Sequence, residues 1–312
     1  MNKDSRIYVA GHRGLVGSAV VRQLRAQGYN NILTRTREEL NLLSAWKTMQ
    51  FFQSERPEYV FDCAAKVGGI MAHIKAPSEF MWENLSIQNN LIMAAKVSRV
   101  QKFLFLGSAC AYPKLEGSDG EAIKESSLLT GPLEPSNQNY AIAKIAGIKL
   151  CESLHAEGHD FISVMPTNLY GSGDNYNLET SHVLPGMIHR IHLAMIHGEA
   201  DVMLWGTGNP VREFLYSDDL ARACIRLMER PRNDDGLINI TSGCPVRLTV
   251  LADLVATAVG YTGEIQWDPS KPDGTPCRIL DGLKMRKLGW QPTVHLVDGI
   301  AAVYRDFLGK QL

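Results

Sequence analysis

Tyr140 and Lys144 are the residues whose types and spacing most directly suggest chemistry in this sequence. In a helix, side chains four positions apart lie on one face, so the phenol and the ammonium can act together. A nearby ammonium lowers the pKa of a phenol from about 10 towards neutral pH, which makes Tyr140 a candidate general acid. Ser108, in the segment GSAC at 107–110, could hydrogen-bond the same substrate oxygen. These residues predict the protonation of a carbonyl oxygen.

A glycine-rich turn near the start of the chain is the second chemical signal. Gly11, Gly14 and Gly17 follow an apolar run, and an amphipathic segment begins directly after them. Small residues let the backbone approach a pyrophosphate, and the third glycine lets a helix pack against its strand. The N-terminus of that helix would face the phosphate charge. A tight strand–helix turn without a ligand is the alternative, but the strand–turn–helix context favours dinucleotide binding.

The residues after the second predicted strand indicate which dinucleotide binds. An acidic residue at this point usually binds the ribose 2′-hydroxyl of NAD, whereas a 2′-phosphate favours arginine. The sequence has Arg35 and Arg37 here and Arg13 inside the glycine-rich turn, although Glu38 follows. We therefore predict NADPH as the cofactor. Solvated surface charges are the alternative for the two arginines, and we expect one of them to be such a charge.

Short apolar runs alternate with longer amphipathic segments through the first half of the chain. Apolar runs separated by helices imply parallel strands joined by right-handed crossovers, so we predict a Rossmann-type, doubly wound α/β sheet. Ligands of such a sheet bind beyond the carboxyl ends of its strands. The predicted strands are Arg6–Ala10, Asn31–Thr34, Tyr59–Cys63, Lys102–Leu106 and Phe161–Met165. The predicted helices are Leu15–Gln27, Ala45–Ser54 with Ser44 as N-cap, Pro77–Ser98 and Ala141–Glu157.

After about residue 170 the pattern changes to helices joined by long polar loops. Such loops in a compact protein more often bind ligands than not. The loops are Gly171–Ser181, Trp205–Pro210 and Asp268–Pro276. The helices are His182–Ile196, Asp218–Glu229 with Ser217 as N-cap, Val250–Val259 with Thr249 as N-cap, and Leu296–Leu308. We expect an NADP-binding Rossmann domain at 1–170, joined by a segment near 212–243, and a smaller, mainly substrate-binding α+β domain at 171–312.

Length, charge and cysteine usage exclude several classes of protein. The 312 residues include 32 basic and 33 acidic ones, a formal net charge of −1, so nothing electrostatic suggests nucleic acid or an anionic membrane as partner. The 6 cysteines lack C-x-x-C spacing, which argues against structural zinc and a disulfide scaffold, and we predict no metal. No apolar run reaches the length of a signal peptide or a membrane span. We expect a soluble, cytoplasmic protein.

Further motifs are spread over nearly the whole chain. They are GHRGLVGSA at 11–19, RTREELNL at 35–42, AAKVGGI at 64–70, FLGSACAYPK at 105–114, NYAIAKIAGIKLCE at 139–152, MPTNLYG at 165–171, SHVLP at 181–185, WGTGNPVREF at 205–214 and SKPDGTPCR at 270–278. With these motifs the chain resembles the extended short-chain dehydrogenase/reductases of the nucleotide-sugar class. Within that class it resembles the epimerase/reductases that act on GDP-4-keto sugars. Ala109 is a small departure, since many relatives carry a second serine there.

The resemblance implies a bifunctional, NADPH-dependent 3,5-epimerase and 4-reductase that converts GDP-4-keto-6-deoxy-D-mannose to GDP-L-fucose. Ser108, Tyr140 and Lys144 would then reduce the C4 ketone with hydride from NADPH. Cys110 and His182 would exchange protons at C3 and C5, whose hydrogens the C4 ketone acidifies. A thiolate that removes a proton and an imidazolium that returns one suit this task. The implied contacts to the GDP-sugar are Arg190, Trp205, Arg212 and Asp273.

The turn and the resemblance together imply an extended set of cofactor contacts, with Pro166–Leu169 along the nicotinamide. The set is Gly11, His12, Arg13, Gly14, Leu15, Val16, Gly17, Arg37, Glu38, Asn41, Leu42, Leu106, Gly107, Ser108, Lys144, Pro166, Thr167, Asn168, Leu169 and His182. The resemblance also implies a homodimer, in which the helices at Pro77–Ser98 and Ala141–Glu157 pair with their copies as a two-fold bundle.

Other functions on the same fold fit the sequence less well. A 4,6-dehydratase would need carboxylic acids where Ala109 and Cys110 stand, and a 4-epimerase that retains NAD would need an acid after the second strand. A sister epimerase/reductase acting on another GDP-4-keto sugar, a dideoxyhexose such as colitose or a 6-deoxyheptose, has the same motifs. The alternative from another class is a non-catalytic NADP-sensing protein, which would have no reason to keep the catalytic residues.

Overall fold

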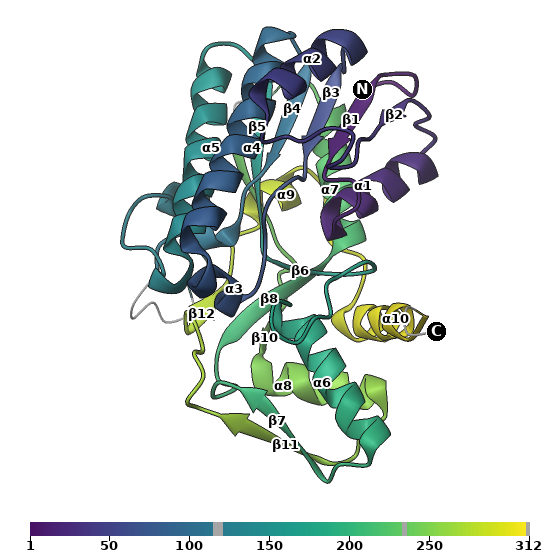
Figure 1. Ribbon diagram of the computed structural model, residues 1–312, viewed down its shortest axis with the longest axis vertical. Helices are drawn as coiled ribbons and strands as arrows, with labels where there is room; N and C mark the ends of the chain where they lie inside the picture. Colours follow the sequence, from purple (N-terminus) through teal and green to yellow (C-terminus); the bar gives the residue numbers. More distant parts are fainter. Residues whose placement is uncertain (115–120, 233–235, 310–312) are drawn as a thin grey trace.

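The main sheet of the protein is parallel and fills the upper part of Figure 1. The computed structural model describes residues 1–114, 121–232 and 236–309. The strand order in the sheet is β2-β1-β3-β4-β5-β9. These strands are β1 (Ile7–Ala10), β2 (Ile32–Leu33), β3 (Tyr59–Asp62), β4 (Lys102–Leu106), β5 (Phe161–Pro166) and β9 (Leu237–Ile240). The chain runs outward from β1 to β2 and returns to the other side of β1 as β3, so the switch point lies between β1 and β3.

Helices cover both faces of this sheet, which confirms the doubly wound α/β fold. One face packs against α2 (Ala45–Glu55), α4 (Pro77–Val97) and α5 (Gln138–Ala156). The other face packs against α1 (Leu15–Ala26), α7 (Ser217–Glu229) and α9 (Leu283–Lys287). The strands are apolar on both sides because each side contributes to a separate buried core. None of the helices in the described ranges is long and apolar enough to cross a membrane.

The lower part of Figure 1 consists of short strands and three longer helices. Strand β8 pairs with β10, β12 and β6, and β11 pairs with β7. The strands are β6 (Asn168–Tyr170), β7 (Asp201–Trp205), β8 (Val211–Tyr216), β10 (Pro245–Arg247), β11 (Glu264–Asp268) and β12 (Cys277–Arg278). The helices, which share a third apolar core, are α6 (Val183–His197), α8 (Leu248–Val259) and α10 (Leu296–Gly309). Strand β9 and helix α7, although late in the sequence, belong to the upper part.

Short helices lie in the segments that follow β3 and β4. They are α3 (Ile70–Lys75), η1 (Ala109–Ala111), η2 (Glu125–Ser127) and η3 (Pro135–Asn137). Glu213 on β8 adds a buried tie, because its carboxylate accepts hydrogen bonds from the backbone N–H groups of Gly243 at 3.0 Å and Leu280 at 2.8 Å. The hydroxyl of Thr167 donates to the backbone carbonyl of Glu213 at 3.1 Å. The chain leaving β5 is thereby held against β8.

Two of the expected helix caps are wrong, and contacts with other parts of the fold explain both. Ser44 caps α2 as expected, accepting the backbone N–H of Lys47 at 3.3 Å. Ser217, however, is the first residue of α7, and its hydroxyl is buried against Gly171 with no hydrogen-bond partner within the described ranges. Thr249 lies inside α8, which starts at Leu248 because carbonyls of the 205–210 loop accept the N–H groups of Leu248 and Thr249. Tertiary contacts therefore replace the side-chain caps that the sequence suggested.

Candidate active site

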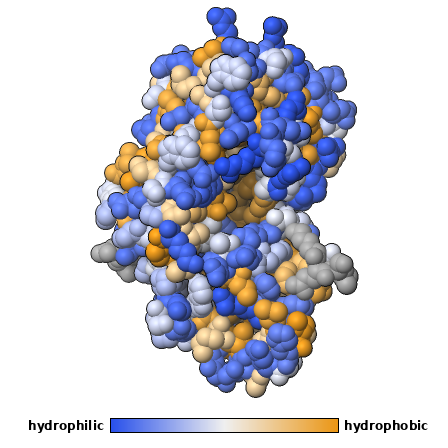
Figure 2. All heavy atoms as spheres, viewed as in Figure 1, coloured by the Kyte–Doolittle hydropathy of each residue, from blue (hydrophilic) through white to orange (hydrophobic). Residues whose placement is uncertain are grey.

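A cavity of about 660 Å³ opens at the switch point of the main sheet and extends to the lower part. Figure 2 shows it as a hollow between the two parts, with apolar residues visible inside. Its walls come from the carboxyl ends of β1, β3, β4 and β5, from the segment that precedes α6, from the end of β7 and from residues 272–275. Within the described part of the chain, no group of three or more His, Cys, Asp or Glu residues is arranged to hold a metal ion.

The glycine-rich turn has the shape that a dinucleotide requires. Gly11 has a φ of 72°, and a Cβ there would lie 2.7 Å from the carbonyl oxygen of Cys63. A Cβ at Gly17 would lie 2.2 Å from the carbonyl oxygen of Gly11, so only glycine lets α1 approach the turn. Gly14 is the N-cap of α1 and has no side chain to occupy the N–H groups that begin the helix. The turn therefore presents free backbone donors to a phosphate, as the expected cofactor requires.

Most of the expected cofactor contacts line this cavity. The lining residues of that set are Gly11, Gly14, Leu15, Val16, Arg37, Asn41, Leu42, Leu106, Gly107, Ser108, Lys144, Pro166, Thr167, Asn168, Leu169 and His182. Gly17 lies behind the turn, and His12, Arg13 and Glu38 lie outside the lining. Arg13 and Glu38 are exposed, whereas the Nδ1 atom of His12 is buried and finds no hydrogen-bond partner in the described part of the chain.

The two arginines after β2 have different surroundings. The guanidinium of Arg35 is held by the carboxylate of Glu55 and the carbonyl of Thr34, and it lies 5.3 Å from the centre of the Phe51 ring. The side chain of Arg37 is 69% exposed at the edge of the cavity and lies 3.6 Å from Glu83. Arg37 therefore has the freedom to bind a phosphate that Arg35 lacks.

Tyr140, Lys144 and Ser108 meet at the carboxyl end of β4. The ammonium of Lys144 donates to the carbonyl of Leu106 at 2.8 Å and lies 6.0 Å from the centre of the Tyr140 ring. The hydroxyl of Ser108 accepts the backbone N–H of Cys110 at 3.3 Å and hydrogen-bonds Tyr140. Tyr140 and Lys144 are both buried, and all three line the cavity.

The expected lowering of the Tyr140 pKa is wrong for this structure. Burial raises the pKa of Tyr140 above its ordinary value, Cys110 adds to the rise, and the hydrogen bond with Ser108 opposes it. Burial also lowers the pKa of Lys144 to about 8, against the effect of nearby acidic groups. The cause is the removal of water from both groups, which disfavours their charged forms. Tyr140 is therefore protonated at neutral pH, as a proton donor must be.

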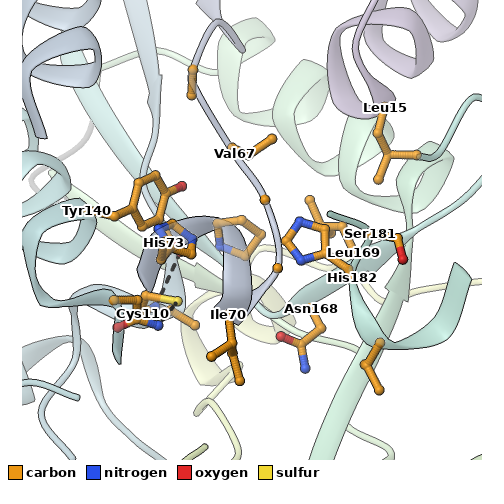
Figure 3. Close-up of a pocket in the computed structure, with 18 of the residues that line it drawn as sticks. Leu15, Val67, Ile70, His73, Cys110, Tyr140, Asn168, Leu169, Ser181 and His182 are labelled. Atoms are coloured by element: carbon orange, nitrogen blue, oxygen red, sulfur yellow. Dashed lines mark hydrogen bonds between the residues drawn. The ribbon is translucent and has the colours of Figure 1, made fainter. Parts of the chain in front are cut away.

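Cys110 and His182 approach the same cavity from different parts of the fold. Cys110 lies in η1, and its sulfur accepts a hydrogen bond from the side chain of Asn137 at 3.3 Å. His182 is the N-cap of α6, and burial lowers its pKa. Figure 3 shows Cys110 beside Tyr140 on one side of the pocket and His182 beside Ser181 on the other. A thiol and an imidazole thus face a common space from two directions.

Sequence reasoning missed two residues of this cavity, His73 and Asn137. The ring of His73, on α3, lies 5.1 Å from that of Tyr140 and 4.1 Å from that of Phe80, centre to centre. Burial, together with His182, lowers the pKa of His73 to about 4, so its ring is neutral. His73 follows the AAKVGGI motif and Asn137 precedes Tyr140 by three residues. Their closeness in sequence to these motifs could have suggested a place in the site. Sequence spacing alone does not show where either side chain points.

The expected substrate contacts line the lower end of the cavity. The guanidinium of Arg190 lies 4.7 Å from the centre of the Trp205 ring, which forms a flat cationic and aromatic surface. Burial and the neighbouring Arg278 lower the pKa of Arg212 to about 10, so Arg212 remains charged near neutral pH. The carboxylate of Asp273 accepts both the backbone N–H and the hydroxyl of Thr207, each at 2.7 Å. In this structure Asp273 therefore anchors the 205–210 loop.

Comparison with known proteins agrees with this geometry. Residues 7–241 match the model of the NAD dependent epimerase/dehydratase family. GDP-L-fucose synthase 1 of Arabidopsis thaliana is 49% identical over 308 residues, 98% of this chain and 94% of the relative. GDP-L-fucose synthase of Escherichia coli K12 is 47% identical over 315 residues, 98% of this chain and 97% of the relative. GDP-L-colitose synthase of Yersinia pseudotuberculosis is 33% identical over 98% of this chain and 99% of the relative.

Solved structures show the same fold over the full length. The chain matches a GDP-L-fucose synthetase from Naegleria fowleri bound to NADP, with a TM-score of 0.88 and 29% identity. The match covers 100% of this chain and 96% of that one. The resemblance to nucleotide-sugar enzymes of the extended short-chain dehydrogenase/reductase type is confirmed, and the chain belongs to the NAD dependent epimerase/dehydratase family.

Proposed function

We propose that this protein converts GDP-4-keto-6-deoxy-D-mannose to GDP-L-fucose as a bifunctional 3,5-epimerase and 4-reductase that uses NADPH. The observation that carries the proposal is the meeting of Tyr140, Lys144 and Ser108 with Cys110 and His182 in one cavity beside a dinucleotide turn. The similarity to GDP-L-fucose synthases, at 47–49% identity, supports this substrate. The lower similarity to a GDP-L-colitose synthase, at 33%, makes a dideoxyhexose the weaker alternative.

The cofactor would lie along the glycine-rich turn and reach the carboxyl ends of β4 and β5. NADPH supplies the hydride that reduces the ketone. Gly11 and Gly14 would approach its pyrophosphate, Arg37 its 2′-phosphate, and Pro166–Leu169 its nicotinamide. The domain division follows from this placement: residues 1–170, with the segment near 212–243, would bind the cofactor, and the rest of 171–312 mainly the GDP-sugar.

The reductase residues act on the oxygen of the C4 ketone. The hydroxyls of Ser108 and Tyr140 would hold this oxygen, and Tyr140 would give it a proton as the alkoxide forms. The phenolate left on Tyr140 is costly in a buried site, and the ammonium of Lys144 offsets that charge. The same three residues would stabilise the enolate oxygen that forms during epimerisation.

The epimerase residues act on the carbons beside the ketone. Cys110 would remove a proton from C3 or C5, and His182 would return one from the opposite face of the ring. Because burial lowers the pKa of His182, its protonated form is a stronger acid than an ordinary imidazolium. Asn137 would orient the sulfur of Cys110 through its hydrogen bond. Arg190, Trp205, Arg212 and Asp273 would bind the GDP portion.

Product analysis tests the whole proposal. The purified protein is incubated with GDP-4-keto-6-deoxy-D-mannose and NADPH, and the product is identified by NMR while absorbance follows NADPH oxidation. We expect GDP-L-fucose. A reduced sugar with unchanged C3 and C5 would show a reductase alone, and no oxidation of NADPH would refute the proposed activity.

Replacing Arg37 with alanine tests the choice of cofactor. We expect a rise of roughly tenfold or more in the KM for NADPH and little change for NADH, because a charged hydrogen bond to the 2′-phosphate is lost. Arg35→Ala serves as the matched comparison, since Glu55 and Thr34 already engage its guanidinium. An equal rise in the KM for NADPH and for NADH in Arg37→Ala would mean that this residue does not bind the 2′-phosphate.

Tyr140→Phe tests the proton donor. General acid catalysis contributes about 10²–10⁴-fold, so NADPH oxidation should fall by that factor while the dissociation constants for cofactor and substrate change little. Tyr59→Phe is the control, because its hydroxyl bonds only Gln101 at the surface and lies away from the cavity. A near wild-type rate in Tyr140→Phe would remove Tyr140 from this role.

Cys110→Ser and His182→Gln test the separation of the two half-reactions. A hydroxyl is a far weaker acid than a thiol, so Cys110→Ser should stop deuterium entry at C3 and C5 in D₂O while C4 reduction continues. His182→Gln should impair protonation and give misconfigured product. In Tyr140→Phe, by contrast, deuterium entry should continue while NADPH oxidation collapses. Full deuterium exchange at both carbons in the Cys110→Ser, His182→Gln double variant would contradict the assignment. Cys244→Ser is the control, because Cys244 is an exposed cysteine.

Helix α4 is the surface that we propose for homodimer formation together with α5. Trp82, Met93 and Val97 are exposed and lie on one face of α4, spaced by eleven and four residues. Trp82→Glu should halve the mass measured by light scattering at micromolar concentration, because it places a charge in the contact. Trp46→Glu, an equally exposed tryptophan on α2, should leave the mass unchanged. An unchanged mass in Trp82→Glu would rule out this interface.

A further inference from the structure

A row of side chains crosses the main sheet beneath α5. In the strand register Asp62 on β3 lies opposite Phe105 on β4, and Phe105 lies opposite Ser163 on β5. Alternate residues of a strand share a face, and Val60, two residues before Asp62, packs in the core that α4 and α5 cover. Phe105 belongs to that same core. The side chain of Asp62 therefore lies in the layer between the sheet and α5.

Lys144 enters this layer from α5. Its ammonium lies 4.7 Å from the centre of the Phe105 ring and donates to the carbonyl of Leu106 at 2.8 Å. Phe105 is the cross-strand neighbour of Asp62, so the ammonium and the carboxylate occupy adjacent positions above the sheet. The two groups are close enough to affect each other's pKa: Lys144 lowers the pKa of Asp62, and Asp62 raises the pKa of Lys144.

Asp62 uses only part of its hydrogen-bonding capacity. The residue is 1% exposed, and its Oδ1 atom accepts the backbone N–H of Ala64 at 3.2 Å. Its Oδ2 atom is buried and has no hydrogen-bond partner among the residues that the structure describes. A buried carboxylate oxygen without a donor is costly unless a positive charge lies near it. Lys144 supplies that charge.

The titratable groups around the pair come from several elements. Burial raises the pKa of Asp62 to about 7, and Lys144 and the N–H of Ala64 oppose this rise. Burial lowers the pKa of Lys144 to about 8, and Asp62, Cys63 and Cys151 oppose this fall. Tyr140 faces Lys144 from the same helix, and Tyr8 on β1 faces Asp62. Of the groups that oppose the fall in the Lys144 pKa, Asp62 has the largest effect.

We propose that Asp62 is a positioning residue for the reduction: its carboxylate is the counter-ion that keeps the buried Lys144 ammonium charged at its place beside Tyr140. The inference rests on the proposed function, in which the charge of Lys144 stabilises the phenolate of Tyr140. A purely structural role, the support of the turn after β3 through the N–H of Ala64, is the competing explanation. Asp62→Asn separates the two, because an amide oxygen can still accept that N–H but carries no charge.

The pH profile of reduction is the first test. Reduction should decline as pH rises through the pKa of Lys144, since its charge is then lost. In Asp62→Asn the neutral side chain no longer favours the ammonium, so the decline should move to lower pH by about one unit. Ser163→Ala is the matched control: it removes an uncharged hydroxyl from the same row and should leave the midpoint unchanged. An unshifted midpoint in Asp62→Asn would overturn the inference.

A double-mutant cycle in the cofactor-free protein is the second test, and it needs no catalysis. Urea unfolding is measured for Asp62→Asn, Lys144→Met and the double variant. At about pH 7.5 the double variant should lose less stability than the sum of the single variants, because each single change leaves a buried charge unpaired. At about pH 5, below the pKa of Asp62, the carboxyl is protonated and the non-additivity should shrink.

The two tests separate this inference from the proposed function. If the wild-type protein fails to oxidise NADPH with the keto sugar, the proposed function is wrong. The double-mutant cycle still tests the interaction between Asp62 and Lys144, because it needs no catalysis. If the wild-type protein is active but the cycle is additive at both pH values, Asp62 is not the counter-ion. A non-additive cycle together with a shifted midpoint supports it.

Discussion

The hydrogen bond from the buried ammonium of Lys144 to the carbonyl of Leu106 holds the catalytic centre together. It joins α5 to the carboxyl end of β4. Tyr140 on α5 and Ser108 after β4 are positioned by this contact. Tyr140 lies one helical turn before Lys144, and Ser108 lies two residues after Leu106. A charge at this depth is stable only with compensation, which the carbonyl, the Phe105 ring and the Asp62 carboxylate provide.

In the proposed function, two kinds of proton transfer share the resulting cavity because two parts of the fold meet there. Residues after β4 supply Ser108 and Cys110, and the guanidinium of Arg278 holds the carbonyl of Ala109 between them. The opposite wall comes from the start of α6, where His182 stands. The buried carboxylate of Glu213 binds the backbone N–H groups of Gly243 and Leu280, in two segments where the chain passes between the upper and lower parts of the fold. The proposed reduction at one carbon and proton exchange at its neighbours would therefore need no release of the sugar between them.

Burial changes the chemistry of several groups in ways that residue type does not show. A lysine four residues after a tyrosine suggests a lowered phenol pKa, yet loss of water around Tyr140 raises that pKa, and the hydrogen bond with Ser108 opposes the rise. Ser217 and Thr249 are good cap residues by type, but neither is an N-cap. Ser217 packs against Gly171, and the backbone N–H of Thr249 donates to the carbonyl of Gly208. His73 and Asn137 carry no motif of their own and enter the site only because α3 and η3 fold over it.

The sequence alone determined the class of fold, the glycine-rich turn and the Tyr140–Lys144 pair, because these depend on local periodicity and short spacings. It also indicated the family, through motifs that extend over nearly the whole chain. Only the tertiary structure decided which arginine after β2 is the more exposed, which groups surround Cys110, and that Asp62 lies beside Lys144. These outcomes depend on strand register, helix packing and the exclusion of water, and such properties arise from contacts between residues far apart in the sequence.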